Sequence, residues 1–334
     1  MVEGRARNRD VSHIYLQRHP ELAALEQGIP MRQFYYNVQL RNLDFEYKLL
    51  TKITETREHA CLLIENSPEL RSQNRYPDVL PYKDTVVLLS NGAYVNASFI
   101  DGATQGSEGQ FVVTQGPMSR TVEKFWEMVY EQEVSLIVMT CNYFESNQSK
   151  CDRYFPPAES LELDNFTITL QKKKKPYPGL AVRRFILSRN EEGSPTKTVL
   201  HIQYKTWQDH TCPTIDEEFD ALNYILYLMK KHSAMRRKVA VHCSAGIGRS
   251  GTLMALYNIV TGLEKQLLYE SAGAQVEPKL SVFGVVRRLR EQRWGMVQTK
   301  DQYRFIYEFM EYWITSFLTQ QEEETAPEDE AMVE

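Results

Sequence analysis

The sequence predicts an α/β fold, because strand-like and helix-like patterns alternate along most of the chain. The 334 residues would fit either one large domain with extensions or two smaller domains, so length alone does not decide. With 42% hydrophobic and 25% charged residues, the composition is that of a globular protein with a sizeable core. A third observation is an apolar strand that leads through a glycine-containing loop into an apolar helix, an order found in α/β proteins.

The first part of the chain is expected to contain helices and then strands. Residues 1–20 form a polar extension, whereas apolar residues at helical spacing, such as Leu40, Leu43 and Leu50, predict helices within 21–65. A region rich in Pro, Asn, Ser and Asp predicts a loop at 66–83. Between 84 and 190, β-branched and aromatic runs predict strands at 85–89, 111–114, 136–140 and 166–170, and a helix is expected at 120–132.

The second part of the chain alternates between strands and helices. Strands are predicted at 198–204 and 238–242, and helices at 217–231, 251–263, 279–292 and 300–318. The last residues, 319–334, concentrate acidic charge without an apolar face, so we expect a disordered tail there.

Charge and cysteine usage disfavour several classes of protein. A formal net charge of -5 argues against non-specific nucleic-acid binding, which needs a basic surface. Runs of about 18 apolar residues are missing, and the first residues lack the apolar core of a signal peptide, so we expect a cytoplasmic protein without a membrane span. The five cysteines show no CxxC pair and no Cys/His cluster, so neither a disulfide framework nor a metal site is expected.

The residues that carry chemistry are centred on Cys243, in the stretch HCSAGIGRSG. Gly246 and Gly248 let successive backbone N–H groups converge, and the helix that begins near Arg249 adds its positive dipole end, so the loop can hold a phosphate. The same positive field favours the thiolate form of Cys243, which is the nucleophilic form. Arg249 can offer a planar fork to phosphate oxygens, and Ser250 is placed to donate to the sulfur. The alternative is a buried structural cysteine before a tight turn.

This stretch resembles the signature loop of the phosphotyrosine-specific, cysteine-dependent protein tyrosine phosphatases of the non-receptor type. Further blocks follow in the family's order, namely NRYPD at 74–78, YVNAS at 94–98, TQGP at 114–117, FWEM at 125–128, WQD at 207–209 and QTKDQ at 298–302. The resemblance covers about residues 70–318. It implies one catalytic domain over 21–318, including the N-terminal helices, with a highly twisted mixed β-sheet flanked by α-helices.

The resemblance implies an enzyme that hydrolyses phosphotyrosine in proteins through a cysteinyl-phosphate intermediate, without a metal ion or cofactor. Cys243 would attack phosphorus, while Arg249 and the loop N–H groups stabilise the transition state. The phosphate-binding residues expected from it are Ser244, Ala245, Gly246, Ile247, Gly248 and Arg249. His242 would orient the loop, and the alternative is a satisfied core histidine without a direct chemical role.

The leaving phenolate needs a proton, which the resemblance assigns to Asp209 as general acid. Asp209 follows Trp207 and Gln208 in the position of the family's mobile Trp-Pro-Asp loop, whose closure would exclude water. Gln208 replaces the family's proline, which frees φ and restores a backbone N–H. We therefore expect turnover to be retained but altered.

Two glutamines are expected to place the water that hydrolyses the intermediate. The resemblance assigns this role first to Gln302 and secondarily to Gln298. The alternative is a helix start capped by Thr299 or a neighbour, and both interpretations can hold together.

Residues of the block at 74–78 would bind the substrate around the phosphate. Tyr76 resembles the aromatic wall that stacks on the phosphotyrosine ring and makes the pocket too deep for phosphoserine. Asp78 matches the residue that accepts N–H groups of the substrate backbone, and Asn74 would support the block. A turn containing Pro77 could explain these residues without any substrate.

Other charged residues have weaker assignments. Glu145 would steady Arg249, and Lys150 would approach the acid loop, although an exposed ion pair is the alternative. The lysines at 172–175 could dock acidic substrates or mimic a nuclear localisation patch, but a solvated hairpin tip is favoured. Four arginines could form a basic rim or a solvated helix face, namely Arg287, Arg288, Arg290 and Arg293.

Three functions are compared on these residues. The favoured one is an active, monomeric phosphatase that acts on tyrosine-phosphorylated signalling proteins. A phosphotyrosine-binding protein disabled by Gln208 is disfavoured because Asp209 and Gln302 are retained. A dual-specificity or lipid phosphatase is disfavoured by Tyr76, because those shallow sites lack such a wall.

Overall fold

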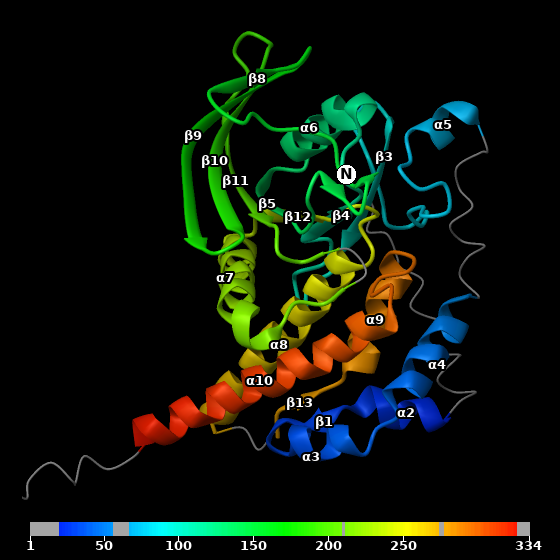
Figure 1. Ribbon diagram of the computed structural model, residues 1–334, viewed down its shortest axis with the longest axis vertical. Helices are drawn as coiled ribbons and strands as arrows, with labels where there is room; N and C mark the ends of the chain where they lie inside the picture. The colour runs from blue at the N-terminus through cyan, green and yellow to red at the C-terminus, as the bar shows by residue number, and fades with distance from the viewer. Residues whose placement is uncertain (1–19, 56–66, 209–210, 274–276, 326–334) are drawn as a thin grey trace, which may run out of the picture.

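The computed structural model describes residues 20–55, 67–208, 211–273 and 277–325. A central mixed sheet runs through this part of the chain, with helices on both faces (Figure 1). Its strands lie in the order β2 (Val86–Leu88), β3 (Tyr94–Ile100), β4 (Phe111–Thr114), β12 (Lys238–His242), β5 (Val134–Met139), β11 (Lys197–Tyr204), β10 (Leu180–Arg189), β9 (Phe166–Tyr177) and β8 (Ser160–Glu162). The four central strands β4, β12, β5 and β11 are parallel, and the outer pairs are antiparallel. The predicted mixed sheet with flanking helices is therefore confirmed.

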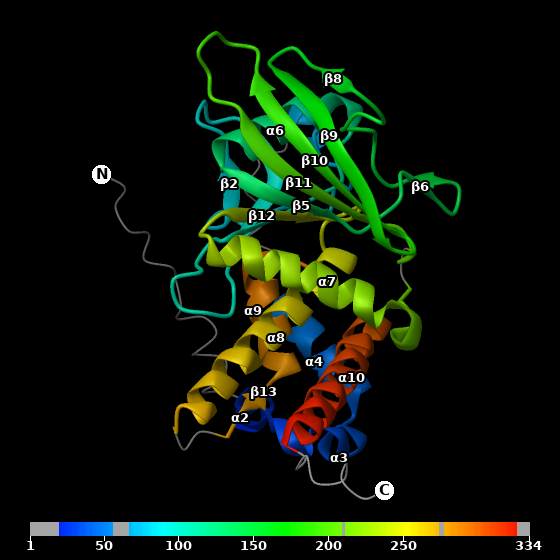
Figure 2. The same cartoon turned by 90° about the vertical axis from the view of Figure 1, so that its left-hand side faces the viewer.

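The sheet separates two layers of the hydrophobic core, each covered by helices. Figure 2 shows one face of the sheet covered by α7 (Ile215–Ala234), α8 (Arg249–Ser271), α9 (Val282–Gln292), α10 (Lys300–Thr325) and the N-terminal helices α2 (Pro20–Gln27), α3 (Phe34–Gln39) and α4 (Leu43–Glu55). The other face packs on α6 (Val122–Glu131). Alternate residues of β12 enter the two layers, since Val239 and Val241 pack on one side and Ala240 on the other. This explains the continuous apolar run of that strand.

The structure corrects the sequence prediction in two segments, the predicted loop at 66–83 and the start of the helix predicted from 279. The predicted loop at 66–83 contains the helix α5 (Pro68–Ser72), because the Ser67 hydroxyl accepts the N–H of Leu70 at 3.2 Å and proline occupies the first helical position. The helix expected from 279 begins only at Val282. Its first predicted residues instead form strand β13 (Lys279–Leu280), which pairs with β1 (Ile29–Pro30).

The structure also changes the interpretation of two charged segments. Helix α10 continues to Thr325, so the disorder predicted from residue 319 is wrong for 319–325; the rest of that tail, 326–334, lies outside the described residues, as do 1–19. Glutamine and glutamate have high helix propensity and can extend a packed helix without an apolar face. The lysines at 172–175 belong to β9 rather than to a hairpin tip, and all four are exposed. Lysines on a strand near a sheet edge discourage pairing with other chains.

No helix in the described ranges has the length and apolarity needed to cross a membrane.

Apolar residues of the N-terminal helices mostly face the core, with Leu50 buried and Leu43 packed against it. Leu40 is an exception, because it lies at the end of α3 and is exposed.

Candidate active site

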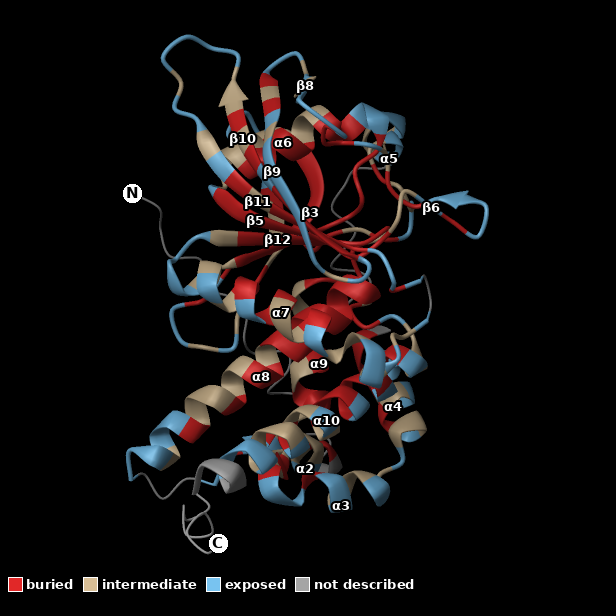
Figure 3. Cartoon of the chain, turned by 60° about the vertical axis from the view of Figure 1, so that its left-hand side comes forward, coloured by how far each residue is buried: buried red, intermediate tan, exposed pale blue. Residues whose placement is uncertain are grey.

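The nucleophile loop joins the carboxyl end of the central strand β12 to the first turn of α8. Cys243 follows the strand directly and is 4% exposed, and α8 begins at Arg249. Figure 3 shows that the central strands and the first turn of this helix are buried. The N–H of Gly246 donates to Cys243 Sγ at 3.3 Å, so a loop amide points at the sulfur. This arrangement brings backbone donors and the positive helix end to one place, as an anion site requires.

The fold of the loop depends on Gly246 and on an arginine that the sequence prediction misplaced. Gly246 has φ +72°, and a Cβ there would lie 2.2 Å from the carbonyl oxygen of Thr114. Arg293 is fully buried and donates to the carbonyl oxygens of Gly246 at 2.9 Å and Ala245 at 3.1 Å. It anchors them to β3 by donating to Asn96 Oδ1 at 2.8 Å. Because these carbonyls are held on the far side of the loop, its N–H groups can point into the cradle.

The predicted basic rim of arginines is therefore wrong. Arg293 supports the loop from inside, and Arg290 is buried and donates to the carbonyl oxygens of Met296 and Val297 at 2.9 and 2.8 Å. Arg287 is buried against Glu26. Of the four arginines only Arg288 is exposed. The helical spacing of these arginines does not show which of them are buried. An arginine is buried where the fold supplies hydrogen-bond acceptors for its guanidinium, and these acceptors come from distant parts of the chain.

Arg249 is held by a carboxylate, as the sequence predicts. Its Nη1 donates to Glu145 Oε1 at 2.9 Å, to Glu145 Oε2 at 3.0 Å and to the carbonyl oxygen of Trp207 at 2.8 Å. Glu145 ends strand β6 (Phe144–Glu145), which turns through two residues of positive φ into β7 (Gln148–Ser149). Burial alone would lower the pKa of Arg249, but the facing Cys243 sulfur and the Glu145 carboxylate outweigh it, and the pKa is raised. The guanidinium therefore remains a cation next to the nucleophile.

A cavity of about 160 Å³ opens onto the nucleophile. Its lining includes Tyr76, Val79, Gln148, Lys150, Cys243, Ser244, Ala245, Gly248, Arg249 and Gln298. The Tyr76 hydroxyl lies 2.9 Å from Ser244 Oγ, so the aromatic side chain forms a wall beside the loop. Asp78 is exposed. Asn74 is buried, and its Oδ1 accepts from the Tyr94 hydroxyl at 2.7 Å, which fixes the segment that carries the wall.

The two glutamines differ in position. Gln298 is exposed and lines the cavity, whereas Gln302 is 1% exposed, with Oε1 accepting the N–H groups of Gln298 at 3.0 Å and Thr299 at 3.3 Å. The Thr299 hydroxyl in turn accepts the N–H of Gln302 at 3.1 Å, so the pair forms a reciprocal cap at the start of α10. Val297, just before Gln298, has φ +59°, and its N–H donates to the Ile247 carbonyl at 3.0 Å. This left-handed residue turns Gln298 toward the cavity.

His242 and Ser250 flank the nucleophile differently from one another. His242 is fully buried, with Nδ1 3.1 Å from the carbonyl oxygen of Cys243 and Nε2 2.7 Å from the Tyr154 hydroxyl. Ser250 is also fully buried, but among the described residues its hydroxyl has no hydrogen-bond partner. The bond predicted from Ser250 to the Cys243 sulfur is therefore not made in this structure.

The structure describes the predicted acid loop up to Gln208 and again from Thr211. Trp207 is fully buried, and its Nε1 donates to the carbonyl oxygen of Thr211 at 2.8 Å. Gln208 is exposed. Asp209, the predicted acid, lies outside the described residues. Lys150, expected near this loop, lines the cavity and donates to Gln148 Oε1 at 3.0 Å.

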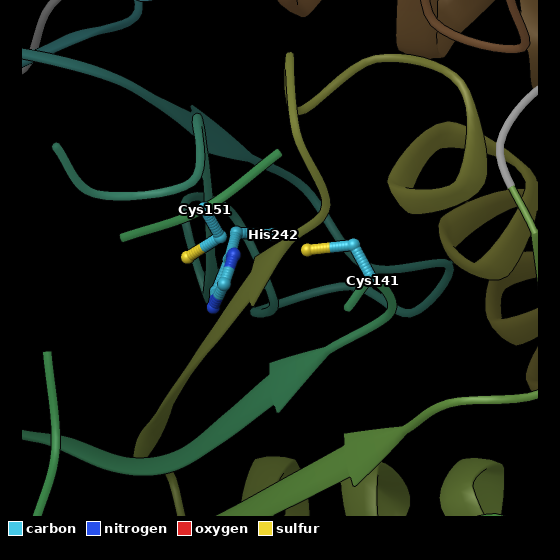
Figure 4. Close-up of side chains that lie close together, drawn as sticks. All are labelled: Cys141, Cys151 and His242. Carbon is cyan, nitrogen blue, oxygen red and sulfur yellow. The ribbon is translucent and has the colours of Figure 1, made fainter. Parts of the chain in front are cut away.

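A buried group of possible metal ligands lies behind the loop. Figure 4 shows Cys141, Cys151 and His242 gathered from three segments. Their ligand atoms all lie within 4.8 Å of one another. Burial raises the pKa of the Cys141 thiol well above its ordinary value, which disfavours the thiolate that a metal requires. Both ring nitrogens of His242 are already hydrogen-bonded. The group therefore fits a metal poorly.

Comparisons with known proteins agree with this site. The family model described as protein-tyrosine phosphatase matches residues 70–312. Human tyrosine-protein phosphatase non-receptor type 13 is 32% identical over 307 residues, which are 91% of this chain and 11% of that protein. The mouse non-receptor type 20 enzyme is 34% identical over 248 residues, which are 73% of this chain and 54% of that protein.

A solved structure shows the same fold. The catalytic domain of human protein tyrosine phosphatase non-receptor type 18 has a TM-score of 0.71 and 29% sequence identity, covering 85% of this chain and 99% of that one. The chain spans 11% and 54% of the two curated relatives named above. On the family match and the shared fold, the chain belongs to the protein tyrosine phosphatase family.

Proposed function

We propose that this chain hydrolyses phosphotyrosine in proteins through a cysteinyl-phosphate intermediate. The observation that carries the proposal is the cavity lined by Cys243 and Arg249, in which the Gly246 amide donates to the Cys243 sulfur. A dianionic phosphate that enters this cavity meets a fixed cation and backbone donors. These groups match the equatorial oxygens of a phosphoryl group in transfer.

In the first step the Cys243 thiolate attacks phosphorus, and the bond between phosphorus and the phenolic oxygen breaks. Asp209 gives its proton to the leaving phenolate, so tyrosine departs neutral. Support for Asp209 comes from its place in the chain, two residues after Trp207, whose carbonyl oxygen accepts a hydrogen bond from Arg249. A loop that contacts the phosphate clamp is suitably located to deliver an acid.

In the second step water attacks phosphorus, Asp209 takes up a proton from it, and the sulfur leaves as thiolate. Ser250 has a buried hydroxyl without a described partner, which can donate to the departing sulfur. We assign water placement first to Gln298, because it lines the cavity. Gln302 lies behind it with its oxygen engaged in the helix cap, and thus acts by holding Gln298 in place.

Tyr76 supports a preference for phosphotyrosine, since an aromatic wall beside the loop matches a substrate ring better than a short phosphoserine side chain. Exposed Asp78 is available to accept N–H groups of a substrate backbone. A solved structure of the type 18 phosphatase holds phosphopeptides from HER2. By analogy we propose tyrosine-phosphorylated signalling proteins as substrates, a cytoplasmic location and a monomeric enzyme.

The second candidate is a phosphotyrosine-binding protein that does not turn over, and the observation that favours it is Gln208 in the acid loop. One assay separates the candidates: phosphate release from phosphotyrosine and phosphoserine peptides and from a phosphoinositide, by wild type, Cys243→Ser and Asp209→Asn. We expect release only from phosphotyrosine, its abolition in Cys243→Ser, and a loss of kcat of about 10²–10⁴-fold in Asp209→Asn. Binding of the phosphotyrosine peptide without release would establish the second candidate, and phosphoinositide turnover would overturn both.

A further inference from the structure

A buried chain of polar groups runs from β10 to the nucleophile. The Tyr154 hydroxyl lies 2.7 Å from Nε2 of His201 and 2.7 Å from Nε2 of His242. At one end, Arg183 Nη1 lies 3.5 Å from Nδ1 of His201. At the other end, Nδ1 of His242 lies 3.1 Å from the carbonyl oxygen of Cys243. Tyr154 and both histidines are fully buried, so solvent does not contact these groups.

The two ends of this chain determine where every proton lies. A guanidinium can only donate, so Nδ1 of His201 is the acceptor and its Nε2 carries the proton. A carbonyl can only accept, so Nδ1 of His242 carries the proton and its Nε2 is the acceptor. Tyr154 sits between them, accepting from His201 and donating to His242. Each contact in the chain therefore has one donor and one acceptor, and each hydrogen bond strengthens the next.

The structure assigns a positioning role to His201: through Tyr154 it fixes the tautomer of His242 that donates to the peptide carbonyl of the nucleophile. This inference rests on the proposed function only in taking Cys243 as the nucleophile. His201 itself touches neither the cavity nor the loop. The hydrogen bond from His242 Nδ1 holds the Cys243 carbonyl in one orientation. It also strengthens the dipole of the peptide group next to the sulfur.

The surroundings keep His201 neutral. Burial, the nearby Arg183 charge and His242 all lower the pKa of His201 well below its ordinary value. The other titratable groups in contact with the chain or close to it are Cys141, Cys151, Tyr143 and Arg183. Burial raises the pKa of the Cys141 thiol and of Tyr143, so both are protonated and uncharged at neutral pH. The Arg183 cation beside His201 repels a second positive charge on that ring.

The alternative is that His201 only fills space among Phe155 and Phe185, whose ring centroids lie 4.4 and 5.7 Å from it. The test compares His201→Leu, which keeps bulk but removes the donor, with His201→Gln, whose amide N–H can reach Tyr154. The matched control is His232→Leu, because His232 also hydrogen-bonds a side-chain hydroxyl, Ser135 Oγ at 2.7 Å, but lies on α7.

The first measurement is the histidine tautomer, read from long-range 1H–15N correlation spectra of the labelled protein. We expect the proton on Nδ1 of His242 and on Nε2 of His201, and both unchanged in His232→Leu. In His201→Gln the proton of His242 should stay on Nδ1. His201→Leu should leave His242 in exchange between its tautomers. The opposite wild-type tautomers would overturn the inference even if His201→Leu failed to fold.

The second measurement is the rate at which iodoacetamide alkylates Cys243 at neutral pH, which requires no phosphatase activity. We expect His201→Leu to slow alkylation by about threefold to tenfold, the worth of one hydrogen bond, and His201→Gln to restore it. Where phosphate release occurs, kcat should fall by a similar factor with KM little changed. If Cys243 is alkylated as fast in His201→Leu as in His232→Leu, the positioning role is refuted and His201 only packs. Loss of phosphatase activity in the wild type would instead count against the proposed function alone.

Discussion

Replacing Arg293 by methionine tests whether the nucleophile loop depends on a guanidinium outside the cavity. Arg293 donates to carbonyl oxygens of Gly246 and Ala245 on the loop, at 2.9 and 3.1 Å. It also donates to Asn96 Oδ1 at 2.8 Å and Ser98 Oγ at 3.2 Å on β3. Methionine keeps an apolar stem of similar reach but offers no donor. The substitution therefore removes the anchor and leaves the packing largely in place.

The magnitude follows from the acceptors that are left behind. The contacts to Gly246, Asn96 and Ser98 are buried, whereas the contact to Ala245 is partly exposed and water can replace the lost donor there. A buried acceptor without a partner costs about 1–3 kcal/mol, so the low end for three of them gives a loss of about 3 kcal/mol in the free energy of unfolding. Because one of the buried acceptors belongs to the loop, kcat/KM should also fall by about 100-fold, as when a transition-state donor is misplaced.

Urea unfolding measures the first effect, and initial rates on a phosphotyrosine peptide, taken well below the unfolding transition, measure the second. Arg288→Met is the matched control, since the Arg288 side chain is 52% exposed and its contact with Glu26 is 3.6 Å. We expect the control to lose less than about 0.5 kcal/mol. Equal losses in the two variants, or an Arg293→Met protein with wild-type kcat/KM, would refute the anchoring role.

Three further predictions concern the loop, the glutamines and pH. Gly246→Ala should abolish the folded cradle, since its Cβ would lie 2.2 Å from a backbone oxygen, whereas Gly193→Ala, with similar φ but open space, should fold; thermal melting and vanadate binding report both. Gln298→Ala should make the cysteinyl phosphate accumulate, seen as a burst in rapid-quench kinetics, while Gln302→Ala should mainly lose about 1 kcal/mol of stability through its cap. The pKa of His201 is lowered by burial in the folded state, so below the ordinary value of 6.5 the unfolded state binds more protons and stability falls as pH falls. Urea unfolding between pH 5 and 7 should show that loss in the wild type and a shallower one in His201→Gln.

The sequence predicted the parts of the site that are local in the chain. The strand before Cys243, the loop and the helix from Arg249 are consecutive, and their residue types carry the pattern without tertiary information. The pairing of Glu145 with Arg249 came from the family resemblance and is present at 2.9 Å. These predictions succeeded because a short motif or a family block determined them.

The predictions that failed needed tertiary contacts. Arg293 and Arg288 have the same chemistry and lie near one another in the chain, yet one is enclosed by loop carbonyls and the other is exposed. The place of Gln298 at the cavity depends on the left-handed Val297, which no residue pattern indicates because valine rarely adopts positive φ. Which of Gln298 and Gln302 places the water stays a prediction. Lysine runs carry no period-2 signal, so the strand at 172–175 could not be separated from its turn.

The hydrogen bond from Arg249 to the Trp207 carbonyl oxygen joins the phosphate clamp to the acid loop, at 2.8 Å. Binding of an oxyanion to Arg249 and the position of the Trp207 segment share this contact, so the two equilibria are thermodynamically linked. Whatever factor the segment's position applies to the oxyanion affinity, oxyanion binding applies to the equilibrium of the segment. Gln208 is next to this contact and gives the backbone freedom that proline would remove. For the proposed hydrolysis inorganic phosphate is the product, and its affinity would change with the position of the Trp207 carbonyl. A residue outside the cavity could in this way tune product inhibition without touching the reacting atoms.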